Sequence, residues 1–174
     1  FESGALKILK KKKNLRIIDS NKLNNNNLNI ISSQFNSLLI QTSDTFSFSK
    51  SNFKIVSKIK PNFKTLKNLI FAFNVCRFVK SNAIVIANNG STIGIGSGQP
   101  SRLDSCEIAI NKMNKFFKEK KSDEIIAASD AFFPFVDGIE KLVQSGVSAI
   151  IQPSGSIRDK EIIKFANKTN TILV

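Results

Sequence analysis

The sequence contains no histidine, tyrosine or tryptophan among its 174 residues, and it has one methionine and two cysteines. Without histidine, the chain lacks the side chain that most often acts as a general base near neutral pH. Cys76 and Cys106 are far apart and form no Cys-x-x-Cys pair. This spacing argues against a zinc site and predicts two buried free thiols, as expected of a cytoplasmic protein.

Long hydrophobic runs are also missing. No stretch of about 18 uncharged apolar residues is present, which excludes a membrane-spanning helix of the usual length. The chain starts Phe1-Glu2-Ser3, without methionine and without the basic-then-apolar plan of a signal peptide. From this start we expect a fragment of a longer protein. Hydrophobic residues make up 41% of the chain, enough for the core of one domain.

Acidic residues are few, since 26 Lys and Arg face 13 Asp and Glu, for a net charge of +13. Such an excess would suit nucleic acid, an acidic membrane surface or anionic small ligands. The charges are scattered, apart from residues 10–13, and asparagine is abundant, as in residues 24–27. An AT-biased coding sequence enriches Lys, Asn and Ile together. The composition therefore favours that explanation over nucleic-acid binding.

The hydrophobic pattern predicts alternating helices and strands. In the first half we expect a helix at 2–12, strands at 15–18, 37–41 and 53–57, an Asn-rich loop at 20–30, and a buried helix from Pro61 to Lys80. In the second half we expect strands at 83–87, 92–95, 124–128, 148–152 and 171–174, and helices that begin with the capping residues Ser101, Asp137 and Ser156. Residues 88–90 predict a hairpin turn, and Gly146 a helix end. The predicted class is α/β, a layered αβα sandwich.

Three loops follow strands and precede helices, at 94–102, 130–137 and 153–158. Such loops can meet at one edge of an α/β sheet, where ligands bind. The glycines at 94, 96 and 98 match a dinucleotide fingerprint weakly, because Gln99 stands where the third motif glycine is expected and the preceding strand leaves a hairpin. Tight backbone turning explains this loop slightly better than phosphate binding.

The loop at 130–137 carries three aromatic residues within four positions, Phe132, Phe133 and Phe135. Aromatic rings beside carboxylates at the end of a strand would suit a slot for a flat ligand. The same rings would equally suit plugs of the hydrophobic core. From spacing alone the two interpretations stay open.

Two polar residues near these loops also have alternative roles. Arg102 lies at a helix start, where it and the helix amino terminus would favour an anion, although a lone arginine is more often solvated. The amide of Asn82, just before a buried strand, would suit a carboxamide or formyl oxygen. Taken alone, Asn82 is better explained as a cap of the preceding helix.

Four motifs together carry a family resemblance. They are residues 79–87 (VKSNAIVIA), 94–102 (GIGSGQPSR), 128–135 (ASDAFFPF) and 151–159 (IQPSGSIRD), and residues 11–16 (KKKNLR) extend the match. In this order they resemble the bifunctional purine-biosynthesis family that combines AICAR formyltransferase with IMP cyclohydrolase. The resemblance covers nearly the whole chain, which looks like the carboxy-terminal part of the formyltransferase domain.

The resemblance implies a cytidine-deaminase-like α/β layer without the deaminase zinc, and a cytoplasmic homodimer with sites near the subunit interface. The family transfers a formyl group from 10-formyltetrahydrofolate to AICAR, and a separate amino-terminal domain closes the product FAICAR to IMP. Residue by residue, Asn82 matches a catalytic position near the transferred formyl group, and Phe132 and Arg102 match the AICAR site. The folate pocket is matched by Leu103, Pro134, Phe135 and Asp137. Ser81 and Asp130 match a monovalent-cation site, with K⁺ as the expected ion.

The sequence also departs from the family. The catalytic Lys-His pair belongs to an upstream motif that this chain does not contain, and the terminal Arg-containing segment is missing. Val136 and Asn88 stand where many relatives have basic residues. We therefore expect the chain alone to be inactive, supplying binding walls and Asn82. A basic nucleic-acid-binding module and an inactive partial product are the alternatives, and the lack of Lys or Arg among the clustered aromatics argues against the first.

Overall fold

The computed structural model describes residues 2–18, 29–46, 48, 50–117 and 124–174. The chain divides into two compact units, Phe1–Ser47 and Phe48–Val174.

The described residues of the first unit form one helix and one hairpin. Helix α1 spans Ser3–Leu9, and strands β1 (Asn29–Gln34) and β2 (Ser37–Thr42) pair antiparallel. The predictions of α1 and β2 are confirmed, whereas β1 was not expected among Asn, Ser and Gln residues with low strand propensity. The predicted loop at 20–30 lies largely outside the described residues, and its last two residues begin β1. The buried strand predicted at 15–18 is wrong, because Ile18 is 77% exposed and the segment is irregular.

The second unit is built on a five-stranded mixed sheet, with strand order β4-β3-β5-β6-β7. Its strands are β3 (Ile84–Asn88), β4 (Ser91–Gly96), β5 (Ile125–Ser129), β6 (Val147–Ile151) and β7 (Ile172–Leu173). Its helices are η1 (Lys50–Asn52), α2 (Phe63–Cys76), α3 (Arg102–Phe116), α4 (Val136–Gln144) and α5 (Asp159–Lys168). Strand β3 runs antiparallel to β4 and β5, while β5, β6 and β7 are parallel.

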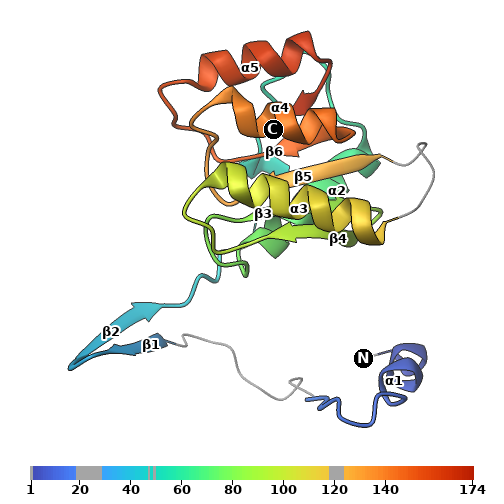
Figure 1. Cartoon of the computed structure of the whole chain (residues 1–174), viewed down its shortest axis with the longest axis vertical. Helices are drawn as coiled ribbons and strands as arrows, with labels where there is room; N and C mark the ends of the chain where they lie inside the picture. The colour runs from blue at the N-terminus through green and yellow to red at the C-terminus, as the bar shows by residue number, and fades with distance from the viewer. Residues whose placement is uncertain (1, 19–28, 47, 49, 118–123) are drawn as a thin grey trace. The chain divides into compact units, whose positions relative to one another are not determined.

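Helices cover both faces of this sheet. Figure 1 shows α3 and α4 in front of the strands and α2 behind them. The alternation along β3 explains the two layers: Ile84 and Ile86 point into a core with α3, α4 and α5, and Val85 and Ala87 point into a core with α2. Strand β3 is therefore buried on both sides, and the predicted α/β class is confirmed.

Two glycines let α3 lie directly on β4. A Cβ atom at Gly94 would stand 2.2 Å from the Ala109 carbonyl oxygen, and one at Gly96 would stand 1.9 Å from the Ser105 carbonyl oxygen. No side chain fits against helix backbone at that distance. Gly94 and Gly96 therefore lie within β4 and serve close helix–strand packing. The predicted tight backbone turning applies at Gly98, which has a positive φ of 68°.

Helix boundaries depend on single side chains. The cap prediction at Ser101 is confirmed, since its Oγ accepts a hydrogen bond from Asp104 N at 3.5 Å. Helix α2 starts later than predicted because Asn62, not Pro61, forms the cap by accepting from Thr65 N at 2.9 Å. The cap predicted at Asp137 is wrong, because α4 begins at Val136 after Phe135. Helix α5 begins at Asp159, later than predicted, but the hydrogen bonds of the predicted Ser156–Asp159 cap are present: Arg158 N donates to Ser156 Oγ at 3.1 Å and Ser156 N donates to Asp159 Oδ1 at 3.2 Å.

The strand predicted at 53–57 is wrong as well. Val56 N and Ser57 N both donate to the same carbonyl oxygen, that of Leu173, at 3.0 and 3.3 Å. Since two successive donors use one acceptor, the segment runs beside β7 without forming a regular ladder.

The two cysteines are buried free thiols, as predicted. Cys76 belongs to the core beneath α2, and Cys106 to the core on the other side of the sheet. Burial raises the pKa of each thiol to about 12, so neither is a thiolate at neutral pH. Among the residues that the structure describes, no helix is both long and apolar enough to cross a membrane.

Candidate functional site

Several chain segments meet at one end of the sheet. Ile84 at the start of β3 pairs with Gly96 at the end of β4 and with Ser129 at the end of β5, and Ala128 pairs with Ile151 at the end of β6. The loops that follow β4, β5 and β6 therefore leave from the same edge. This is the arrangement expected of ligand-binding loops in an α/β sheet.

A hollow of about 450 Å³ opens at this edge, a size that suits a small ligand. Seven of the residues predicted for the site line it: Asn82, Arg102, Leu103, Phe132, Pro134, Phe135 and Asp137. They come from the approach to β3, from the start of α3 and from the loop after β5. The fold thus brings together residues that the sequence separates by as many as 55 positions.

The spacing of the three aromatic residues left two interpretations open, walls of a ligand slot or plugs of the core, and the structure shows some of each. Phe133 is 1% exposed and is a core side chain, whereas Phe132 and Phe135 are 40% and 50% exposed at the hollow. One ring therefore anchors the loop, and its two neighbours present ring surface to the cavity.

Neighbouring groups hold this aromatic loop in place. Phe133 N donates to the side-chain oxygen Oε1 of Gln152 at 3.0 Å, which ties the loop to the end of β6. Ser129 Oγ donates to the Ala131 carbonyl oxygen at 2.6 Å. A Cβ atom at Gly138 would stand 2.8 Å from the Phe133 ring, so the glycine makes room for this anchor.

Asn82 does not cap the preceding helix, so that interpretation is wrong. Its amide nitrogen Nδ2 lies 2.9 Å from the Gln99 carbonyl oxygen and 3.1 Å from the Pro100 carbonyl oxygen. Its oxygen Oδ1 lies 2.9 Å from Arg102 Nη2. The side chain therefore connects the approach to β3 with the loop before α3, at the wall of the hollow.

Arg102 is not a solvated arginine, since its side chain is 10% exposed. Its Nη1 donates to Asp130 Oδ1 at 2.5 Å and to Ser129 Oγ at 2.8 Å. The planar guanidinium suits such simultaneous donation to several acceptors. Sequence reasoning placed Arg102 at the site but missed its partner Asp130 and the link to Asn82.

Asp130 lies behind Arg102 and not among the residues that line the hollow. Burial acts to raise the pKa of its carboxyl, but hydrogen bonds from Ser81, Arg102 and the Ala83 backbone outweigh burial and hold that pKa below its ordinary value of 3.8. The carboxylate is therefore charged at neutral pH and paired with the guanidinium.

Ser81 and Asp130, the residues matched to a monovalent-cation site, do lie together, but their contacts do not fit a bound cation. The Ser81 side chain makes its hydrogen bond to the Asp130 carboxylate, and Arg102 already places a positive charge 2.5 Å from that carboxylate. Within the described part of the chain, no group of three or more His, Cys, Asp or Glu could hold a metal ion.

Leu103, Pro134 and Asp137, matched to the folate pocket, all lie at the hollow. Leu103 is half-buried, and Pro134 and Asp137 are exposed. Asp137 Oδ1 accepts from Gly138 N at 2.7 Å, which directs this carboxylate at the start of α4. An apolar wall and a carboxylate therefore flank the same opening.

Arg158 was not predicted as a site residue. Its guanidinium carbon lies 4.7 Å from the centre of the Phe135 ring, so the loop after β6 contacts the aromatic loop through a cation–π pair. The loop at 153–158 was predicted to reach the site, but nothing in its sequence distinguishes Arg158 from the many other cations.

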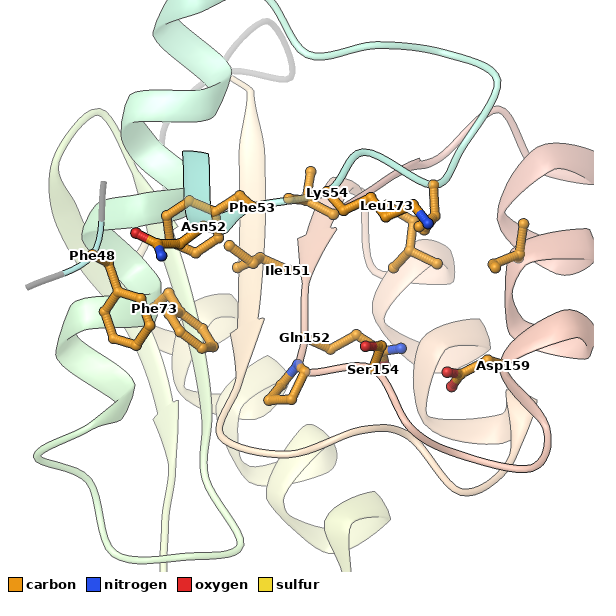
Figure 2. Close-up of a pocket in the computed structure, with 14 residues that line it drawn as sticks. Phe48, Asn52, Phe53, Lys54, Phe73, Ile151, Gln152, Ser154, Asp159 and Leu173 are labelled. Atoms are coloured by element: carbon orange, nitrogen blue, oxygen red, sulfur yellow. The ribbon is translucent and has the colours of Figure 1, made fainter. Parts of the chain in front are cut away.

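A second hollow, of about 440 Å³, lies elsewhere in the unit. Figure 2 shows Phe48, Phe53 and Phe73 grouped at one end and Asp159 at the other, with Gln152 and Ser154 between them. The three rings contact one another with centroids 5.2 to 5.9 Å apart. Its lining includes no residue predicted for the site, so the hollow at the aromatic loop remains the candidate site.

Comparison with known proteins identifies relatives of this chain. Residues 1–112 match the family model described as AICARFT/IMPCHase bienzyme. The chain is 44% identical over 175 residues to the bifunctional purine biosynthesis protein PurH of Buchnera aphidicola subsp. Schizaphis graminum, covering 100% of this chain and 33% of that protein. It is 40% identical over 176 residues to PurH of Lactobacillus acidophilus, covering 100% of this chain and 34% of that protein. The chain therefore spans about a third of the length of these relatives.

Proposed function

The chain belongs to the AICARFT/IMPCHase bienzyme family, and we propose that it is part of an AICAR formyltransferase of purine biosynthesis. The reaction moves a formyl group from 10-formyltetrahydrofolate to the 5-amino group of AICAR and gives FAICAR and tetrahydrofolate. Ring closure to IMP belongs to a separate amino-terminal domain. The observation that carries the proposal is the gathering of the predicted AICAR and folate residues around one hollow.

The two ligands occupy different sides of the hollow. Phe132 offers half-exposed ring surface to the imidazole of AICAR, beside Asn82. Phe135, Pro134 and Leu103 form an apolar wall for the flat pterin, whose N–H groups donate to the Asp137 carboxylate. Holding the amine and the formyl carbon in contact supplies much of the rate enhancement in such a transfer.

Proton transfer requires groups that these residues do not supply. The attacking amine loses a proton and the departing folate nitrogen gains one, which is general acid–base chemistry. The chain has no histidine, and both cysteine thiols are buried with raised pKa values. The proton-transfer groups therefore come from the Lys-His motif elsewhere in the protein, and the 174 residues alone are inactive.

We also propose that the whole protein has a cytidine-deaminase-like fold without zinc in this domain, forms a homodimer and works in the cytoplasm. A monovalent cation near Ser81 and Asp130 is not part of the proposal, because the Asp130 charge is already paired with Arg102. The first experiment is to sequence the coding region on both sides of this segment and look for the Lys-His motif and the Arg-containing tail.

The complete protein then tests the activity. We expect it to convert AICAR and 10-formyltetrahydrofolate to FAICAR and tetrahydrofolate, and Asn82→Ala to lower turnover about 100-fold or more. Wild-type turnover in this variant would contradict the site. The isolated chain should transfer no formyl group. Detectable transfer would mean that these 174 residues themselves contain the proton-transfer groups.

A further inference from the structure

A glutamine at the end of the neighbouring strand holds the aromatic loop. Phe133 N donates to Gln152 Oε1 at 3.0 Å. Pro134 has no N–H group, so Phe133 N is the last backbone donor before Phe135. The Phe133 ring is 1% exposed and fixes one point of the loop in the core. The hydrogen bond to Gln152 fixes the direction of the backbone at that point, and with it the path of the residues that follow.

Gln152 is itself held by the sheet. It directly follows β6, and its N donates to the Val174 carbonyl oxygen at 3.0 Å. Val174 N in turn donates to the Ile150 carbonyl oxygen at 3.0 Å. Two backbone hydrogen bonds therefore join this end of β6 to the residue after β7. A side chain that strands place in this way is a more precise support than one placed by a loop.

The contact requires an oxygen atom on the side chain of residue 152. Because the backbone N–H of Phe133 donates, its partner must accept, and the reversed amide would place the NH₂ group of Gln152 against another donor. Gln152 is not among the residues that line the candidate hollow, and it lines the second hollow instead (Figure 2). It therefore acts on a ligand in the candidate hollow through the aromatic loop.

The two halves of the aromatic loop are held by different groups. Before Phe133, Ser129 Oγ donates to the Ala131 carbonyl oxygen at 2.6 Å, and this bond does not involve β6. After Phe133 come Pro134 and Phe135, which both line the hollow, and the Phe135 ring is 50% exposed. Loss of the contact from the end of β6 would therefore chiefly move the second half of the loop.

We infer that Gln152 is a positioning residue for the apolar wall that Pro134 and Phe135 form. The inference rests on the proposed function, in which this wall receives the pterin of 10-formyltetrahydrofolate. Without an acceptor at residue 152, the partly buried N–H of Phe133 would lack a partner, and the loop would shift until that group reaches water. The wall would then fit the pterin less well, whereas Phe132 on the AICAR side would stay close to its present position.

Two variants of the complete protein separate the accepting oxygen from the size of the side chain. Gln152→Met keeps the length but has no oxygen, and we expect it to raise the KM for 10-formyltetrahydrofolate about five- to twentyfold. The KM for AICAR and kcat should each change less than about threefold, because a binding wall is displaced and the reacting groups are not. Gln152→Glu keeps an oxygen at the same position and should hold the folate KM within about threefold of wild type.

Gln144→Met, the same change at an exposed glutamine of α4, is the matched control and should retain wild-type kinetics. An unchanged folate KM in Gln152→Met would overturn the inference. An equal loss in Gln152→Met and Gln152→Glu would also overturn it, because the accepting oxygen would then not matter. An equal rise in the KM for AICAR would mean that the loop moves as one piece. A purely structural role would lower the amount of folded enzyme and leave both KM values unchanged.

Crystal structures separate failure of this inference from failure of the proposed function. If the wild-type protein transfers no formyl group, the proposed function fails, but structures of the wild type, Gln152→Met and Gln152→Glu still test the positioning. We expect residues 133–135 to be displaced in Gln152→Met and unchanged in Gln152→Glu. An unchanged loop in Gln152→Met would overturn the inference. Gln152→Asn, whose oxygen is one methylene too short to reach Phe133 N, provides the same test if Gln152→Met does not fold.

Discussion

Neighbouring phenylalanines in the loop after β5 have opposite environments, and this difference can be measured. Phe133 is 1% exposed and Phe135 is 50% exposed. Phe133→Ala should lower the free energy of unfolding by about 3–5 kcal/mol, because it leaves a cavity in the core. Phe135→Ala should change stability by less than about 1 kcal/mol and should raise the KM for 10-formyltetrahydrofolate in the complete protein, since it removes part of the proposed pterin wall.

Urea denaturation and steady-state kinetics of both variants check this pair. Equal loss of stability in the two would mean that both rings serve the core. An unchanged folate KM in Phe135→Ala would remove that ring from the proposed folate site.

Asp130 should make stability depend on pH in acid. Its folded-state pKa lies below the ordinary value of 3.8, because hydrogen bonds and Arg102 favour the carboxylate. The unfolded chain therefore takes up the proton first, so the stabilisation is complete above about pH 3.8 and is lost as the pH falls through the lower folded value.

Asp130→Asn removes this contribution. At pH 7 we expect the variant to be less stable than wild type by about 3 kcal/mol, since the Arg102 charge is left without its partner. The difference should shrink as the pH falls below about 3.8. Urea denaturation at a series of pH values measures it, and a difference that stays constant down to pH 2 would contradict this assignment.

At the residue scale, motif spacing located the hollow but not its internal contacts. Family motifs placed Asn82, Arg102 and Phe132 near one another, and the fold brings them to one hollow. The local pattern alone favoured a helix cap for Asn82 and a solvated side chain for Arg102, because their hydrogen-bond partners are 20 and 28 positions away along the chain. Pairings of this kind depend on the register between strands, which local pattern does not contain.

Among the elements, the contact between α3 and β4 makes the sharpest prediction. A methyl group at Gly96 would stand 1.9 Å from the Ser105 carbonyl oxygen, which is fixed helix backbone. Gly96→Ala should therefore lower the free energy of unfolding by about 3 kcal/mol or more, because the helix must shift from the sheet. Gly4→Ala in α1, where a Cβ meets nothing within 4 Å, is the control and should be neutral or slightly stabilising. Thermal denaturation of both variants measures this difference in stability. A Gly96→Ala variant as stable as wild type would contradict the close packing.

Element predictions succeeded where periodicity and flanking signals agreed. The apolar run at 83–87, the Asn-Asn-Gly turn and the cap at Ser101 predicted β3, β4 and α3 close to their observed positions. The strand at 15–18 was predicted from four apolar-rich residues alone, and that segment has no partner strand in the described residues. Strand β1 was missed because its pairing with β2 overrides weak intrinsic propensity.

For the whole molecule, the excess of positive charge makes nucleic-acid binding the main alternative function. Lys58, Lys160, Lys164 and Lys168 line a shallow hollow beside α5, and the chain carries a net charge of +13. If composition rather than function produced these lysines, the protein should show no saturable binding to DNA or RNA at about 0.15 M salt. Fluorescence anisotropy with labelled single-stranded and double-stranded DNA and RNA measures this. Micromolar binding that weakens steeply with salt and is lost in Lys160→Glu/Lys164→Glu would favour the nucleic-acid alternative.

The two buried thiols lie on opposite sides of the sheet, Cys76 on α2 and Cys106 on α3. Each becomes reactive toward a disulfide reagent only when its own layer opens, because burial keeps both protonated in the closed state. The labelling rate of each thiol thus reports the opening free energy of one layer. Equal rates would mean that the three-layered unit opens as a single cooperative body, and unequal rates would identify which helical layer detaches first. The two cysteines therefore act as chemical reporters of local opening, one on each face of the sheet.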